Sequence, residues 1–227
     1  MKTLILCGGE GQRLRPYTIT IPKPLMPFRD KPIVANIINQ LIKFNINSVF
    51  ISVGYLGDLV KAYFNEVSGK LGIRVDFLEE KFPLGTAGPL KLVGDSDDVL
   101  LMNGDTLTDL DYRQLTDFFY QTDSGITIAT FEKNYQIDLG ILHTSGDLLE
   151  SYEEKPLLNY KVSMGIYCIR RDVIAMISKD KRIDIPELVN MCLQKDIKIT
   201  TFIHHGFWFD LGRAEDFEMA IDFFAEH

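Results

Sequence analysis

Short apolar runs alternate with amphipathic segments through the first part of this chain. The runs at residues 3–7, 48–53, 73–78, 98–103 and 126–131 predict strands, because they are short and bounded by polar or turn residues. The segments between them, at 32–45, 58–67, 87–93 and 111–121, predict helices. Strands that alternate with helices indicate a parallel sheet covered by helices on both faces. We therefore expect a Rossmann-like, three-layer α/β/α fold.

The pattern changes after residue 132. Strands are predicted at 140–143, 148–153, 162–169 and 197–203, with helices at 173–177, 185–193 and 214–224. Asp109 and Asp111 are expected at a helix start, where the helix dipole favours them. Because no linker rich in Gly, Ser or Pro divides the chain, we expect one domain over residues 1–227 with a mixed, mainly parallel sheet. Its later part is expected to cover one side of the ligand site.

Composition excludes several classes of function. A net charge of −8 would repel a nucleic-acid backbone, so we expect no nucleic-acid partner. No run approaches the ~20 apolar residues of a membrane span, and no signal peptide is recognised, so we expect no membrane association. The 3 cysteines form no CxxC pair, which favours a reducing cytoplasm over a disulfide framework or a zinc site. A homo-oligomer remains compatible with the sequence.

A glycine-rich turn directly follows the first predicted strand. Gly8, Gly9 and Gly11 let the backbone approach an anion closely and point its N–H groups at it. Arg13 and Lys23 follow and supply full positive charges. A buried strand that ends in glycines and then presents cations is typical of a phosphate-binding site, and we expect the ligand to be a nucleotide.

A carboxylate is expected beside this phosphate site. Asp105 comes directly after the strand predicted at 98–103, just as Gly8 follows the strand at 3–7. In sheets of this type ligands bind beyond the carboxyl ends of the strands. The sequence therefore predicts that Asp105 lies close to the glycine-rich turn.

Six ordered motifs together resemble the sugar-1-phosphate nucleotidyltransferases, a family also called nucleotide-sugar pyrophosphorylases. The resemblance covers essentially the whole chain and is closest to mannose- or heptose-1-phosphate guanylyltransferase-like members. Its motifs are Gly8-Gly9-Glu10-Gly11-Gln12-Arg13-Leu14-Arg15-Pro16 with Pro22-Lys23-Pro24, Pro83–Leu90, Asn103-Gly104-Asp105, Glu153-Glu154-Lys155-Pro156, Met164-Gly165-Ile166-Tyr167 and Gly206–Gly212. The resemblance implies an enzyme that joins a sugar 1-phosphate to a nucleoside triphosphate, releases pyrophosphate and uses Mg²⁺.

The resemblance also implies a role for individual residues. Arg13 and Lys23 would be catalytic, and Asp105 and Asp210 would hold the metal. The nucleotide would contact Leu6, Gly8, Gly9, Gly11, Arg13, Glu80, Gly85, Thr86, Asn103 and Asp105. The sugar phosphate would contact Gly140, Glu154, Lys155, Ser163 and Gly165. On this basis residues 1–131 form a nucleotide-binding half and residues 132–227 a sugar-phosphate-binding half.

Two positions depart from the family pattern, and both bear on specificity. Gln12 stands where the family usually has Thr or Ser, and Ser163 stands where it often has Asn. Glu80 favours GTP, since a carboxylate accepts hydrogen bonds from the adjacent N1–H and N2–H₂ of guanine, a pair that cytosine and uracil lack. The sugar substrate stays open among mannose, heptose and related hexose 1-phosphates. The alternative of a cytidylyl-, uridylyl- or thymidylyltransferase that acts on another sugar 1-phosphate also stays open.

Two further classes compete with this interpretation. A dinucleotide-binding oxidoreductase needs a third glycine at position 14, where this chain has Leu14, and an acidic residue ending the second strand, where it has Val53-Gly54. A non-catalytic sensor would not require Arg13, Lys23, Asp105, Lys155 and Asp210 together.

Overall fold

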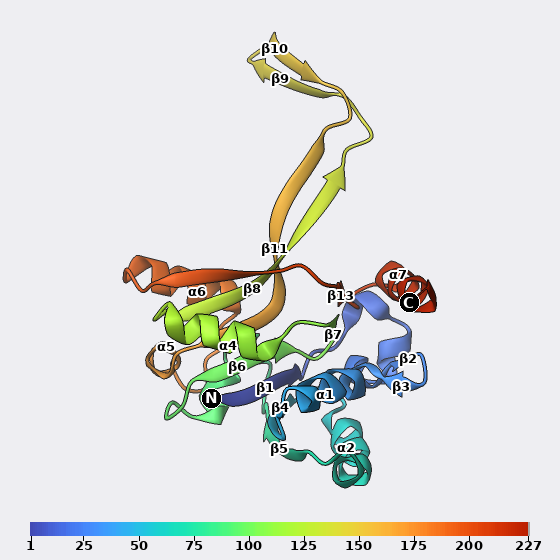
Figure 1. Ribbon diagram of the computed structural model, residues 1–227, viewed down its shortest axis with the longest axis vertical. Coiled ribbons are helices and arrows are strands. Elements are labelled where there is room, and N and C mark those ends of the chain that lie inside the picture. The colour runs from blue at the N-terminus through green and yellow to red at the C-terminus, as the bar shows by residue number, and fades with distance from the viewer. Residues whose placement is uncertain (227) are drawn as a thin grey trace.

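A seven-stranded mixed sheet forms the centre of the structure, a computed structural model that describes residues 1–226 (Figure 1). The strand order is β12 (Ile199–His204), β8 (Ile126–Gln136), β11 (Leu157–Ile169), β6 (Val99–Asn103), β1 (Lys2–Cys7), β4 (Ser48–Val53) and β5 (Arg74–Glu79). All neighbouring strands are parallel except β11, which runs antiparallel to both β6 and β8. The predicted mixed, mainly parallel sheet is confirmed.

Helices cover both faces of this sheet. One apolar cluster packs under α1 (Ile33–Lys43), α2 (Gly57–Leu71), α4 (Tyr112–Gln121) and α7 (Ala214–Glu226). The other packs under α3 (Leu90–Val93), α5 (Arg171–Ala175) and α6 (Ile185–Gln194). Successive residues of β1 lie on opposite faces of the sheet, since Ile5 belongs to the first cluster and Leu4 to the second. The three-layer arrangement is therefore confirmed. Among residues 1–226, none of the helices combines the length and the apolar character needed to cross a membrane.

The helix predicted at 87–93 is shorter than expected. It begins only after Pro89, because the residues before Pro89 form a loop tied to a distant segment. The N–H groups of Ala87 and Gly88 both donate to the carbonyl of Ile183, at 3.0 and 3.2 Å. A tertiary contact thus decides where α3 begins.

The two aspartates expected at a helix start have different roles. Asp111 is the N-cap of α4, where its carboxylate accepts from the N–H groups of Arg113 and Gln114. Asp109 instead lies 2.8 Å from Nε2 of His204 and accepts from the Phe207 N–H at 2.7 Å. The prediction for Asp109 was wrong because its partners come from a distant part of the chain.

Short strand pairs complete the body. β7 (Thr106–Thr108) pairs antiparallel with β13 (Trp208–Asp210), and β2 (Pro27–Phe28) pairs with β3 (Lys31–Pro32). Single turns of 3₁₀ helix lie at Gln12–Leu14, Tyr17–Ile19 and Lys23–Leu25. The β7–β13 pair matters most, because it joins two segments that each carry a predicted metal ligand.

A long two-stranded arm, residues 132–161, projects from the body (Figure 1). β8 and β11 extend beyond the predicted strand limits at 131 and 162 and pair with each other as far as Gln136 and Leu157. β9 (Ile141–Ser145) and β10 (Leu148–Glu153) form a hairpin at the tip. The expectation that the later part covers the ligand site does not hold for this arm, which points away from the body.

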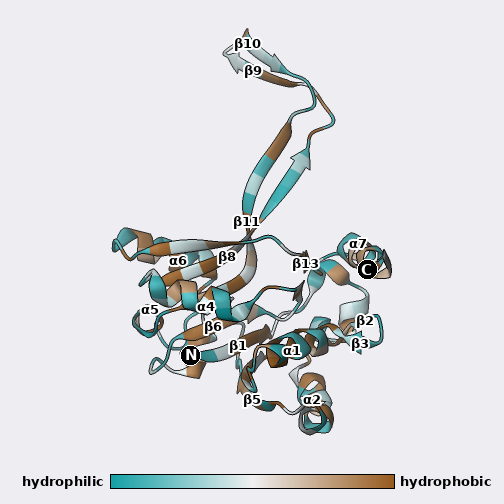
Figure 2. Cartoon of the chain, viewed as in Figure 1, coloured by the Kyte–Doolittle hydropathy of each residue, from teal (hydrophilic) through white to brown (hydrophobic). Residues whose placement is uncertain are grey.

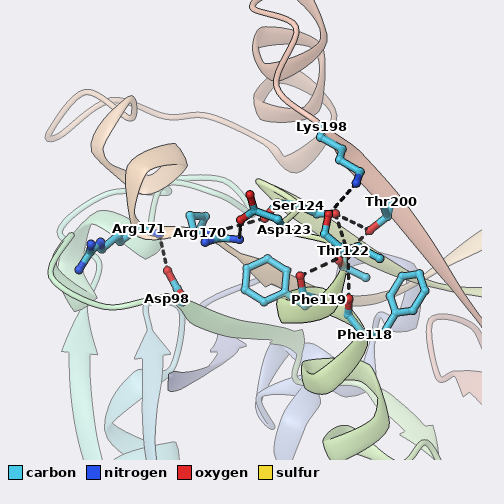
Figure 3. A network of polar contacts seen from close by, with 11 residues as sticks. Asp98, Phe118, Phe119, Thr122, Asp123, Ser124, Arg170, Arg171, Lys198 and Thr200 are labelled. Atoms are coloured by element: carbon cyan, nitrogen blue, oxygen red, sulfur yellow. Dashed lines mark hydrogen bonds and ion pairs between the residues drawn. The ribbon is translucent and has the colours of Figure 1, made fainter.

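Polar contacts close the opposite edge of the sheet, at the amino ends of β8 and β12 (Figure 3). The Ser124 hydroxyl lies 2.9 Å from the hydroxyls of both Thr122 and Thr200. Arg170 donates to Asp123 at 2.7 Å, and Lys198 donates to the Thr122 carbonyl at 2.6 Å. These bonds fasten the end of α4 to the sheet and leave the carboxyl edge free to form a site.

Candidate active site

A cavity of about 620 Å³ opens at the carboxyl ends of β1 and β6. Every residue predicted to be catalytic or to contact the nucleotide lines it: Leu6, Gly8, Gly9, Gly11, Arg13, Lys23, Glu80, Gly85, Thr86, Asn103 and Asp105. These residues lie on segments that are far apart in the sequence. The parallel strands bring the segments together at one edge of the sheet. The structure therefore assembles the predicted set, while the role of each residue stays a prediction.

The glycine-rich turn leaves little room for a side chain at two positions. Gly11 has φ +61°, and a Cβ there would lie 2.9 Å from the Thr18 methyl group. Gly8 lies against the carboxylate of Glu80, where a Cβ would collide. The backbone of this turn consequently forms the floor of the cavity without side chains in the way.

Lys23 and Asp105 form a largely buried ion pair inside the cavity. The Lys23 ammonium donates to Oδ2 of Asp105, and the two side chains are 10% and 19% exposed. Oδ1 of the same carboxylate is buried and has no hydrogen-bond partner among the described residues. A buried carboxylate oxygen without a donor is costly, so this atom is suited to a positively charged ligand.

The β7–β13 ladder brings Asp210 beside this pair. Asp210 is opposite Thr106 in the ladder, and the Leu211 N–H donates to the Asp105 carbonyl at 3.0 Å. Burial raises the pKa of Asp210, and the nearby charge of Asp105 raises it further, while Lys23 and Arg13 act in the opposite direction. Two carboxylates that disfavour each other's charge are a suitable place for a cation.

The donors present fit a magnesium ion. Mg²⁺ is commonly held by one or two carboxylates, with waters and substrate phosphates completing its octahedron. Asp105 offers its unpartnered Oδ1, and Asp210 offers a second carboxylate. Within residues 1–226 no group of three or more His, Cys, Asp or Glu side chains forms a metal site.

Arg13 lies directly against Gly212. A Cβ at Gly212 would stand 2.9 Å from one guanidinium nitrogen of Arg13 and 3.1 Å from the other. Gly212 itself lines the cavity two residues after Asp210. The guanidinium is exposed to the cavity and is placed to meet phosphate oxygens in a bidentate way.

The loop at 83–88 is anchored to the start of α6. The N–H and hydroxyl of Thr86 donate to Oδ1 of Asp184 at 2.9 and 3.3 Å, and the Ile185 N–H donates to the Thr86 hydroxyl at 2.8 Å. Gly85 has φ +77°, and a Cβ there would stand 2.5 Å from the Ile183 carbonyl oxygen. This tight attachment holds the predicted nucleoside loop over one side of the cavity.

Glu80 lies behind the glycine-rich turn and next to this loop. Its Oε2 accepts from the Leu84 N–H at 3.1 Å, while burial raises the pKa of the carboxyl. The other oxygen, Oε1, lies directly against Gly8. Glu80 lines the cavity, and its contact with a base stays a prediction.

The predicted sugar-phosphate residues are not gathered in the cavity. Ser163 and Gly165 lie at the root of the arm, and Gly165, with φ +73°, approaches the amide of Asn103 so closely that a Cβ would stand 2.5 Å from it. Gly140, Glu154 and Lys155 lie on the arm, where Glu154 accepts from the Tyr152 hydroxyl at 2.6 Å. The structure therefore separates these three residues from the nucleotide-side set.

Cys7 lines the cavity but is unsuited to act as a nucleophile. Burial raises the pKa of its thiol far above the ordinary value, and the charges of Asp105 and Glu80 raise it further. The group consequently stays a neutral thiol at physiological pH. Chemistry in the cavity depends on its charged side chains and backbone donors.

Sequence reasoning missed three residues that belong to the site. Arg182 lines the cavity from the side of α6, Gly212 supports Arg13, and Asp184 fastens the 83–88 loop. The basic run Lys179-Asp180-Lys181-Arg182 was a signal for the first. The other two act through tertiary contacts that no local pattern reveals.

Comparisons with known proteins show the family of the chain. A family model described as nucleotidyl transferase matches residues 2–227. The catalytic subunit beta of mannose-1-phosphate guanylyltransferase from Xenopus tropicalis is 30% identical over 226 residues, which is 96% of this chain and 62% of that protein. The mannose-1-phosphate guanyltransferase of Debaryomyces hansenii is also 30% identical, with the same coverage. The chain thus spans about 62% of the length of these curated relatives.

Solved structures share the fold. HddC from Yersinia pseudotuberculosis, complexed with GMP-PN, superposes with a TM-score of 0.77 at 24% identity, covering 98% of this chain and 99% of that one. A putative glucose-1-phosphate thymidylyltransferase from Bacillus anthracis gives a TM-score of 0.75 at 23% identity, covering 98% and 94%. At these identities the likeness concerns the arrangement of helices and strands.

Proposed function

Because the chain belongs to the nucleotidyl transferase family, we propose that it transfers a nucleotidyl group from a nucleoside triphosphate to a sugar 1-phosphate. The triphosphate is GTP, and the sugar is mannose, a heptose or a related hexose. The products are a nucleotide sugar and pyrophosphate. The observation that carries the proposal is that the glycine-rich turn, Arg13, Lys23 and Asp105 line the same cavity. One oxygen of Asp105 has no partner there among the described residues.

The reaction is an in-line displacement at the α-phosphorus. A phosphate oxygen of the sugar 1-phosphate forms the new P–O bond. The bond from the α-phosphorus to the bridging oxygen breaks, and its electron pair leaves with pyrophosphate. The attacking phosphate is already an anion, so no protein nucleophile is needed, and catalysis consists of positioning and charge neutralisation.

The residues of this chain divide these tasks. Arg13, held against Gly212, binds the leaving pyrophosphate with its planar fork. Lys23 orients Asp105 and neutralises charge near the α-phosphate. Asp105 and Asp210 would hold Mg²⁺, which when bound reduces the repulsion between the two phosphate groups. Glu80 and the anchored 83–88 loop receive the base.

GTP is favoured by the position of Glu80 and by the relatives. One Glu80 oxygen accepts from the Leu84 N–H, and the side chain lines the cavity beside the 83–88 loop. Guanine offers adjacent donors that match a carboxylate. The curated relatives named above are guanylyltransferases of mannose 1-phosphate, which supports the same nucleotide here.

We place this activity in the cytoplasm. Cys7, Cys168 and Cys192 are all free and buried, which suits a reducing compartment. Its partners are then small molecules, namely the nucleotide and the sugar phosphate.

A pyrophosphate-release matrix tests the proposal. Each of the four common nucleoside triphosphates is combined with mannose, glucose, heptose and amino-sugar 1-phosphates, with and without Mg²⁺. We expect release only when triphosphate, sugar phosphate and metal are all present, and the highest kcat/KM with GTP. Preference for CTP, UTP or dTTP would replace the guanine assignment, and no release in any combination would contradict the enzyme.

A further inference from the structure

The arm, residues 132–161, is a two-stranded ribbon with an apolar surface and no covering element. Beyond Phe131 in β8 and before Val162 in β11, these two strands pair only with each other, because β12 stops at His204, opposite Phe131. Leu139, Leu148 and Leu157 are 73%, 71% and 60% exposed. Figure 2 shows apolar segments along the arm although it stands clear of the body. An isolated two-stranded ribbon is marginally stable in water, so this surface needs a partner.

The arm also carries the part of the proposed site that the cavity lacks. Gly140, Glu154 and Lys155 lie at the junction between the ribbon and its tip hairpin. Lys155 is exposed, has φ +46°, and its ammonium has no hydrogen-bond or ion-pair partner within the described part of the chain. A free cation on a rigid support is suited to an incoming phosphate.

The ribbon that carries Lys155 is held extended by its own backbone hydrogen bonds. β8 and β11 pair in unbroken register from Thr130 with Ser163 to Gln136 with Leu157. The Ile137 N–H then donates to the Pro156 carbonyl at 3.1 Å, directly beside Lys155. At ~3.3 Å per residue, the ladder from Phe131 to Gln136 spans roughly 16 Å, and Lys155 lies beyond its outer end. Bending the ribbon between these points would leave several N–H and C=O groups unpaired.

The rim of the cavity matches the arm in both polarity and charge. Tyr17 and Ile19 follow the glycine-rich turn and Phe82 precedes the lining residue Pro83, and all three are exposed apolar side chains. Lys81 adjoins the lining residue Glu80, Lys179 and Lys181 lie close in sequence to the lining residue Arg182, and these three exposed lysines form no ion pair among residues 1–226.

The arm has the complementary features. Its tip presents Asp147, Glu150 and Glu153 together with its exposed leucines, and none of these three carboxylates forms an ion pair within the described residues. Apolar surface can therefore meet apolar surface while acidic residues meet basic ones. Since the arm projects away from the body of its own chain, a second copy is the natural partner for its surface.

We infer that two copies of this chain exchange arms, so that each arm docks on the cavity rim of the other copy and delivers Lys155 and Glu154 to the sugar-phosphate side of that copy's site. A two-fold axis makes the exchange reciprocal, so that two arms complete two sites. The role of Lys155 rests on the proposed function. The docking of the arm rests on its exposed apolar surface and on the unbroken ladder.

The first test measures mass in solution by light scattering. The unmodified chain is expected to be a dimer, and Leu148→Glu together with Leu157→Glu to give a folded monomer. Leu193→Glu, an equally exposed leucine on α6, is the matched control and should stay dimeric. A monomeric wild-type chain, or a dimer indifferent to the arm changes, overturns the inference.

A cross-linking test shows whether the arm docks on a second copy or on its own chain, and it needs no measurement of enzyme activity. Cysteines are introduced at Lys155→Cys and Gln12→Cys in one chain, and a short bis-maleimide is added; the native cysteines are buried. Covalent dimers on a denaturing gel are expected. A cross-link within single chains, or none at all, contradicts the exchange whatever the enzyme catalyses.

Complementation tests the shared site. Asp210→Asn and Lys155→Ala are each expected to be inactive alone. Co-expressed under different tags, about half of the dimers are mixed and each mixed dimer has one intact site, so about one quarter of the wild-type rate should return. No recovery in mixed dimers, or full activity of Lys155→Ala alone, overturns the inference and leaves the proposed function standing, provided that the wild-type chain releases pyrophosphate.

Discussion

Oδ2 of Asp105 accepts a hydrogen bond from the ammonium of Lys23, whereas Oδ1 of the same carboxylate is buried and unpartnered among the described residues. The lysine therefore fixes the orientation of the carboxylate and leaves one oxygen for a ligand. The two residues are 82 positions apart in the chain, so the arrangement depends on the complete parallel sheet. A lysine placed in this way serves both the structure and the proposed chemistry.

Asp210→Asn should abolish turnover without destabilising the free protein. Rates should fall by roughly 10²–10³, since a group that neutralises developing charge is lost. Burial and Asp105 raise the pKa of Asp210 above its ordinary 3.8, so the ionised carboxylate disfavours the folded state at pH 7. That disadvantage is absent below the unfolded pKa and grows as the pH rises through the folded pKa. The melting temperature of the variant at pH 7 should equal or exceed that of the wild type.

The stabilisation of the protein by Mg²⁺ provides a second measurement on the Asp210→Asn variant. Adding Mg²⁺ with nucleotide should raise the melting temperature of the wild type and of Asp222→Asn, an exposed aspartate on α7. Asp210→Asn should show little of this rise. Normal turnover in Asp210→Asn would remove Asp210 from the metal site.

Asp105→Asn is expected to cost stability as well as activity. It removes the carboxylate that is paired with the largely buried Lys23 ammonium, and breaking a buried ion pair typically costs about 3–5 kcal/mol. Urea unfolding of Lys23→Met, Asp105→Asn and the double variant gives the coupling free energy between the two side chains. The double variant should lose clearly less than the sum of the single losses. The exposed pair Lys61 and Glu79 is the control, and its coupling should be much smaller. Additive losses for Lys23 and Asp105 would show that the pair is not coupled.

Glu80→Gln should reduce discrimination between bases. The substitution replaces an acceptor-only carboxylate by an amide, so one of the two guanine donors loses its acceptor. We expect kcat/KM for GTP to fall by about tenfold or more, in line with the ~1–3 kcal/mol for an unsatisfied polar group, and that for UTP to change less. The neighbouring Glu79→Gln, on a side chain paired with Lys61, should leave both values unchanged. Equal losses for the two nucleotides would refute the guanine assignment.

Gly212→Ala should slow the reaction through Arg13. The added methyl group would stand within 2.9–3.1 Å of the guanidinium, which must move away from its present position. We expect kcat to fall while the free energy of unfolding changes little, because Arg13 is an exposed side chain that can swing aside. Gly69→Ala, with nothing within 4 Å of the added carbon, is the control. Unchanged kcat in Gly212→Ala would mean that the position of Arg13 is not critical.

Local patterns predicted the body of the fold well. The strand over Ser48–Val53 was predicted with its observed bounds, because a short apolar run rich in β-branched residues specifies a buried strand. The proximity of Asp105 to the glycine-rich turn was also predicted, since Gly8 and Asp105 both follow strands that end at the same edge, whereas the rest of the cavity set came from the family resemblance. Such features depend on residues close together in sequence and on a general rule for parallel sheets.

Features that depend on distant contacts were not predictable. The outer parts of β8 and β11 are polar, as at Glu132 and Lys133, so nothing in their composition marks them as strands. They are held by backbone bonds to each other. Arg182 and Asp184 reach the site because the segment before α6 lies beside the cavity. Asp109 contacts His204 and Phe207, which are distant in sequence. Each of these depends on which segments meet in space.

The β7–β13 ladder has a consequence for how the protein is made. Asp210 reaches its place opposite Thr106 only when β13 has been added to β7. During translation, the glycine-rich turn and Asp105 emerge from the ribosome long before β13 does. A chain that is released early, or cut ahead of β13, would keep the glycine-rich turn and Asp105 in its sequence but would lack Asp210, the second carboxylate proposed to hold the metal.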